Sequence, residues 1–268
     1  MGNFTEVEQE FNQKLIKSGI QSINLRSQEK INMIINNTML SMRIEALKKL
    51  SQKTNRNVIC YYSAWLQSNN GNPDVMINDS DMNGFMNAIN KMDKTKGLDL
   101  ILHTPGGVTT ATESIVNYIK KCFNNNFRVI VPHMAMSAGT MIACASKSIL
   151  MGKQSSLGPI DPQYRGVAAE GVIEEFNRAL ADTIQDTKKS LIWKEIIQQY
   201  RPTFVGECEN VINLSYDLVE NWLKDNMFRG YKNKNDIVKH ILDELASHKK
   251  SKVHDKHYDS TKCKKLGL

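Results

Sequence analysis

The feature that most constrains the fold is an alternation of short apolar runs with helical segments between residues 57 and 151. The helical segments have the length of crossover connections, which join parallel strands through helices on the sheet faces. We therefore predict an α/β fold with a mostly parallel βαβ sheet. The expected strands are residues 58–62, 98–102, 127–131 and 148–151, and the expected helices are 79–92, 109–123 and 138–145.

Helical patterns flank this core on both sides. Residues 1–55 are predicted to form a helical extension, because isoleucine, leucine and methionine recur there at three- and four-residue spacing. Residues 56–268 form the main domain, in which 167–246 is a helical part and 247–268 a basic tail. Its expected helices are 170–200, 210–226 and 236–246, and Asp79 or Ser80 is the expected cap of the helix at 79–92.

Composition excludes several classes of protein. Apolar residues make up 41% and charged residues 24% of the 268 residues, as in globular domains. No run approaches the roughly 18 apolar residues of a membrane-spanning helix, and Glu6, Glu8 and Glu10 are unlike a secretory signal. We expect a cytoplasmic protein, with peripheral membrane contact through residues 1–55 left open.

The basic C-terminal region suggests neither nucleic-acid binding nor a metal site. The net charge is +7, but few aromatic residues lie among the lysines of residues 249–265, so a solvated tail is expected. His248, His254, His257 and Cys263 follow no zinc-ligand spacing, and the five cysteines are scattered. We expect no metal, no cofactor and no disulfide framework.

Three loops follow strands of the predicted sheet, where ligands of parallel sheets bind. In the first, residues 103–107 read His-Thr-Pro-Gly-Gly, and Gly106 and Gly107 allow backbone N–H groups to approach a bound oxygen. In the second, Ser137 precedes the helix that starts with Ala138. A serine there is commonly a helix cap, but its hydroxyl could attack a carbonyl, with the Ala138 N–H as an oxyanion donor. The third is the rigid loop at residues 155–163.

Together these motifs resemble the Clp-protease/crotonase superfamily, and more closely the SDH family (serine dehydrogenase proteinases), relatives of signal peptide peptidase A. The resemblance rests on Leu-Ile-Leu-His-Thr-Pro-Gly-Gly at 100–107, Met-Ser-Ala-Gly-Thr at 136–140, and Leu-Gly-Pro-Ile-Asp-Pro-Gln at 157–163. It covers about residues 57–268 and leaves 1–55 outside.

The resemblance implies a serine peptidase that hydrolyses polypeptides and forms a homo-oligomer. Ser137 stands where the family has its nucleophile, and Gly106 and Ala138 stand where the superfamily has oxyanion donors, with Gly107 beside them. The loop at 155–165 lacks the histidine that the Clp protease carries there. Signal peptide peptidases use a lysine later in the chain instead, and Lys188 follows Ser137 by about fifty residues. The resemblance to that group therefore implies a Ser-Lys dyad with Lys188 as the base.

Alternatives to this prediction remain open. Lys189, His103, His133 and His248 are further candidates for the base. Because the motifs reveal no obvious base, a second hypothesis is a catalytically inactive Clp-fold scaffold or regulatory subunit. A crotonase-like acyl-CoA enzyme is disfavoured, because no carboxylate of the sequence is clearly placed beside the glycine turn.

Overall fold

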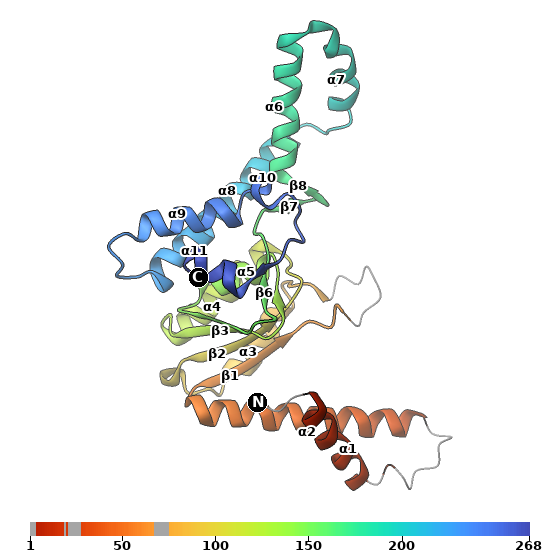
Figure 1. The fold of residues 1–268 in the computed structure, drawn as a ribbon, viewed down its shortest axis with the longest axis vertical. Helices are drawn as coiled ribbons and strands as arrows, with labels where there is room; N and C mark the ends of the chain where they lie inside the picture. The colour runs from red at the N-terminus through yellow and green to blue at the C-terminus, as the bar shows by residue number, and fades with distance from the viewer. Residues whose placement is uncertain (1–3, 19, 21–27, 67–74) are drawn as a thin grey trace. The chain divides into compact units, whose positions relative to one another are not determined.

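A computed structural model describes residues 4–18, 20, 28–66 and 75–268. The chain divides into two compact units, Met1–Val58 and Ile59–Leu268, and each is described by itself. Figure 1 shows the order of the elements along the chain.

The first unit is helical, as expected for residues 1–55. It consists of α1 (Phe4–Lys17) and α2 (Gln28–Thr54). Lys14 Nζ lies 2.7 Å from Glu45 Oε2 and 3.3 Å from Glu10 Oε1, so charged groups join the two helices. An apolar groove between them is lined by Val7, Phe11, Met39 and Met42.

A four-stranded sheet forms the centre of the second unit, in the order β1 (Asn57–Tyr62), β2 (Leu98–His103), β3 (Phe127–Val131) and β5 (Ile149–Met151). β3 pairs in parallel with both β2 and β5. The register places Leu100 opposite Val129 and Val129 opposite Ile149. The predicted α/β class with a parallel sheet is therefore confirmed.

The crossover helices are α3 (Asp81–Ile89), α4 (Thr109–Phe123) and α5 (Ala138–Ala145). Their apolar residues, among them Phe85, Ile115, Ile119 and Ile142, are buried with those of the strands in one core. Ser80, one of the two residues expected to cap α3, lies at the cap position, but its side chain makes no cap hydrogen bond. Asn78 organises the turn instead, since its Oδ1 accepts the Ser80 N–H at 2.9 Å.

The predicted single helix over residues 170–200 is wrong. It is divided into α6 (Ala169–Gln185), a 3₁₀ turn η4 (Thr187–Lys189) and α7 (Ser190–Ile197). Asp186 ends α6, because its backbone is extended (φ −145°, ψ 105°) and its side chain accepts the Lys188 N–H at 3.0 Å. α7 then turns back beside α6 (Figure 1).

Two further helices complete this region. α8 (Phe204–Trp222) begins earlier than expected and continues into a π-helical turn at Leu223–Met227, and α9 (Lys234–Leu245) follows. These helices contribute buried side chains to the same core, namely Val219, Trp222, Val238 and Leu242. No helix in the described part of the chain is long and apolar enough to cross a membrane.

The expectation of a solvated tail at residues 247–268 is also wrong. The segment forms α10 (His248–Ser251), β9 (Tyr258–Asp259) and α11 (Ser260–Leu266). β9 pairs antiparallel with β6 (Ser156–Leu157), and Tyr258, Cys263 and Leu266 are buried in the core. Spaced apolar residues thus fold the segment back, while its lysines face solvent.

A buried ion pair across β2 and β3 gives a test of this core. Asp99 is fully buried, and Arg128 contacts both of its oxygens, with Nε at 2.8 Å and Nη2 at 2.6 Å. Arg128→Ala leaves the carboxylate without this cation and is expected to lower the free energy of unfolding by about 3 kcal/mol. Urea denaturation measures the change. The control is Arg178→Ala, whose guanidinium is 77% exposed; equal midpoints for both variants would contradict the expectation.

Candidate active site

The site begins where the chain leaving β2 is joined to β4 (Met134–Ala135), a short strand that follows β3. The Thr104 N–H donates to Met134 O at 3.1 Å, and the Met136 N–H donates to Thr104 O at 3.0 Å. These two bonds hold the glycine turn beside the chain that leads to Ser137.

Ser137 occupies a sharp corner between β4 and α5. Its backbone has φ 50° and ψ −117°, a conformation that residues with a side chain rarely adopt. Its side chain makes no cap hydrogen bond, so the common role of a helix-cap serine is not the one seen. A strained serine on a strand-to-helix corner is the arrangement that presents a nucleophile in α/β-hydrolases.

Gly106 packs directly against this corner. It has φ +112°, and a Cβ built on it would lie 2.7 Å from Ser137 Cβ and 2.9 Å from Met136 O. Gly107 is equally confined, because a Cβ there would lie 2.2 Å from Ile77 O. Both glycines are therefore required by close backbone approach rather than by a loose turn.

Two backbone N–H groups beside Ser137 are available to a ligand. The Gly106 N–H is occupied, since it donates to Thr104 Oγ1 at 3.1 Å. Within the residues that the structure describes, the N–H groups of Gly107 and Ala138 have no acceptor. Of the three positions named from the sequence, Gly107 and Ala138 thus have free donors, and Gly106 shapes the turn.

The third loop packs on the same corner. β6 pairs in parallel with β4, and the Gly158 N–H then donates to Thr140 Oγ1 of α5 at 2.9 Å. A Cβ on Gly158 would lie 3.3 Å from Met136 Cα, so the loop lies against the residue before Ser137. Three residues further along is Asp161, which is 1% exposed.

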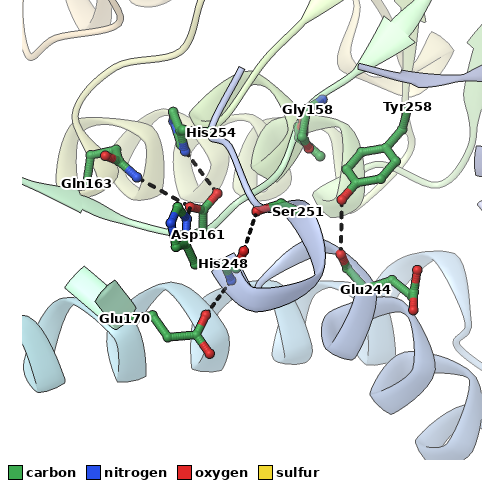
Figure 2. A network of polar contacts seen from close by, with 10 residues as sticks. Gly158, Asp161, Gln163, Glu170, Glu244, His248, Ser251, His254 and Tyr258 are labelled. Carbon is green, nitrogen blue, oxygen red and sulfur yellow. Dashed lines mark hydrogen bonds and ion pairs between the residues drawn. The ribbon is translucent and has the colours of Figure 1, made fainter. Parts of the chain in front are cut away.

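Asp161 holds two histidines. His248 Nδ1 lies 2.8 Å from Asp161 Oδ2, and His254 Nδ1 lies 2.9 Å from Asp161 Oδ1 (Figure 2). Both rings are partly exposed, at 25% and 31% of their side-chain surface. A carboxylate bound to Nδ1 fixes the ring and its tautomer and leaves Nε2 for proton transfer.

This carboxylate–histidine group is only partly anticipated by the sequence. His248 was among the candidates for the base, but Asp161 and His254 were not given a role. Asp161 lies 87 residues before His248 and 93 residues before His254 in the chain. The signal that could have found them is an aspartate in the rigid third loop together with histidines in an otherwise Lys-rich segment.

The structure places the other two candidate histidines elsewhere. The His103 ring is stacked between Tyr62, at 4.8 Å, and His133, at 5.6 Å between ring centroids. Burial lowers the pKa of His103, which is 3% exposed. Side chains alternate along a strand, and the neighbouring Thr104 faces Gly139 of α5. His103 therefore points away from the α5 corner.

Lys188 and Lys189 lie in η4, at the end of α6 that is far from its start beside the third loop. η4 packs mainly against α6 and α7. Lys189 Nζ is bound to Asp182 at 2.9 Å. No contact described in the structure brings either lysine to Ser137.

A cleft of about 810 Å³ opens beside the glycine turn. Its lining includes Met76, Ile77, Gly107, Val108 and, from α8, Leu214. Gln163 also lines the cleft and donates to Asp161 Oδ2 at 3.3 Å. Gly107 thus belongs both to the glycine turn and to the lining of the cleft.

Comparison with known proteins agrees with this arrangement. The parallel sheet, the strained serine and the paired glycines define a ClpP-like class of fold. A family model described as ClpP-like SDH-type serine proteinase matches residues 30–268, and the chain belongs to this family. The match begins within α2, so it reaches further towards the N-terminus than the sequence motifs indicated.

Two curated relatives come from Methanocaldococcus jannaschii, and both are described as uncharacterized. The chain is 34% identical to protein MJ0137 over 187 residues, which are 68% of this chain and 60% of that protein. It is 38% identical to protein MJ1495 over 104 residues, or 39% of this chain and 35% of that protein. The matched region thus spans less than two thirds of either relative.

The contact between Gly106 and Ser137 predicts a sharp effect of one methyl group. Gly106→Ala is expected to displace the serine corner and to lower the labelling rate of Ser137 by a fluorophosphonate at least tenfold, because no space exists for the Cβ. The control is Gly84→Ala in α3, where nothing lies within 4 Å of the added Cβ. Mass spectrometry of the labelled protein measures both rates; equal rates would refute the role given to Gly106.

Proposed function

We propose that this protein is a serine peptidase that hydrolyses peptide bonds in polypeptides, with Ser137 as its nucleophile. The observation that carries the proposal is the strained backbone of Ser137, with φ 50°, held against Gly106 and followed by the free N–H of Ala138. Membership of a family described as serine proteinases supports the same reaction.

The proposed reaction uses these groups in two steps. Ser137 Oγ would attack the carbonyl carbon of a bound peptide while its proton passes to a base. The developing oxyanion would accept hydrogen bonds from the N–H groups of Gly107 and Ala138, the latter at the start of α5. The base would then protonate the leaving amine, and water would hydrolyse the acyl-enzyme in a second, similar step.

Two candidates for the base follow from different arguments. The sequence predicts a dyad of Ser137 and Lys188, and this stays a prediction. The contacts of Asp161 favour a histidine, because this buried carboxylate orients His248 and His254, and the loop that carries Asp161 packs through Gly158 against Met136. We propose that one of these two histidines accepts the proton of Ser137.

A fluorophosphonate probe tests the nucleophile. Ser137 Oγ forms a bond to phosphorus, fluoride leaves, and the proton goes to the base, so only an activated serine reacts. We expect one label per chain on Ser137 and none on Ser137→Ala, with Ser146→Ala as the control, because Ser146 is fully buried and its hydroxyl is bonded to Ala143 O. A folded protein that no probe labels would favour the inactive scaffold or regulatory subunit.

The same labelling experiment identifies the base. The double variant His248→Ala/His254→Ala is expected to label at least about 100-fold more slowly, since general-base assistance commonly contributes 10²–10⁴. The single variants show which ring acts. Lys188→Met is expected to label at the normal rate; a large loss with this variant and none with the histidine variants would establish the dyad instead.

We also propose that the protein forms a homo-oligomer through the α6–α7 hairpin, whose apolar residues Leu180, Ile184, Leu191 and Ile192 are 63–76% exposed. Sedimentation equilibrium is expected to give a multiple of the single-chain mass, and the variant Ile184→Lys/Leu191→Lys a smaller one. The mass of a single chain for the unmodified protein would contradict this proposal. A cytoplasmic location and peripheral membrane contact stay predictions.

A further inference from the structure

We propose that Glu170 is a positioning residue that holds the histidines on Asp161 in their reactive arrangement. The proposal rests on the peptidase function proposed above. Glu170 lies in the first turn of α6 and is half-buried. Neither the sequence motifs nor the family description gives it a role.

Glu170 accepts a hydrogen bond from the backbone of His248. The His248 N–H donates to Glu170 Oε2, as the dashed line in Figure 2 shows. His248 is the first residue of α10, and Ser247 before it provides no side-chain cap. An N–H at this position of a helix has no partner within the helix. A carboxylate from α6 therefore supplies the acceptor that α10 itself lacks.

The ring of His248 is held by a second carboxylate. His248 Nδ1 is bound to Asp161 Oδ2, so backbone and side chain of one histidine are each held by a carboxylate. Two fixed points, rather than one, determine the direction of the ring. Without Glu170 the ring would remain tethered but could rotate and shift with α10.

Both carboxylates belong to one braced segment of the chain. Between Asp161 and Glu170 the chain makes a hairpin of β7 (Gln163–Tyr164) and β8 (Val167–Ala168). The Ala169 N–H closes this segment by donating to Pro162 O at 3.1 Å. The spacing between the two acceptors is therefore fixed by local backbone bonds.

The effect of Glu170 extends to both histidines because they share Asp161. Oδ2 of this carboxylate serves His248 and Gln163, while Oδ1 serves His254. A shift of His248 would leave a buried oxygen short of a partner and would turn the carboxylate. The direction of the His254 ring would change with it, so the role of Glu170 does not depend on which ring is the base.

Labelling kinetics with a fluorophosphonate test the proposal. Glu170→Ala is expected to lower the rate of the covalent step by about tenfold to 100-fold, as small displacements of catalytic groups do, and to leave the probe's binding constant within twofold. Glu170→Asp, whose carboxylate is one methylene shorter, should also be slow and guards against misfolding of the alanine variant. Glu170→Gln keeps an acceptor oxygen and should restore most of the rate.

The matched control is Glu174→Ala, one turn along the same helix. Its carboxylate is 44% exposed and, within the described part of the chain, is paired with the terminal amine of Lys249 at 3.3 Å, so normal kinetics are expected. Normal rates for Glu170→Ala and Glu170→Asp, or equal loss in all three Glu170 variants, would overturn the positioning role alone. Failure of the unmodified protein to label at Ser137 would overturn the peptidase function and this role with it.

Discussion

The pair of hydrogen bonds that Thr104 makes with Met134 and Met136 is the interaction on which the site depends. It continues the parallel pairing of the sheet past the ends of β2 and β3, where each chain would otherwise diverge into its own loop. Gly106 is thereby brought against Ser137. The strain at Ser137 is sustained because backbone bonds on both sides over-determine its position.

The sequence predicted the centre of the fold closely. The predicted bounds of α4, β3 and α5 agree with the structure, because each segment has a clear apolar period and ends at polar residues such as Asn124 or Ser146. The predictions from the sequence were wrong where a single side chain, or pairing with a distant segment, determines the secondary structure. Asp186 divides a helical pattern through its own side chain, and residues 258–259 become a strand only by pairing with β6.

The candidate site shows the same division. Ser137 and the two glycines lie on loops between strongly patterned elements, so order along the chain was enough to bring them together. Asp161 and His254 could not be paired in this way, because 93 residues and the helices α6 to α10 separate them. Their association depends on how residues 247–268 fold back, and the lysines of this segment, with few aromatic residues among them, had indicated a solvated tail.

The return of this segment to β6 has a consequence for the protein during its synthesis. Ser137 and the glycine turn leave the ribosome more than 100 residues before His248 and His254. At about 5–20 residues per second, several seconds pass in which a nascent chain can hold the serine but not the rings on Asp161. If one of these histidines is the base, as we propose, an incomplete nascent chain would be unable to cleave neighbouring polypeptides. Peptidase activity would begin only after the segment that carries His248 and His254 has folded against Asp161.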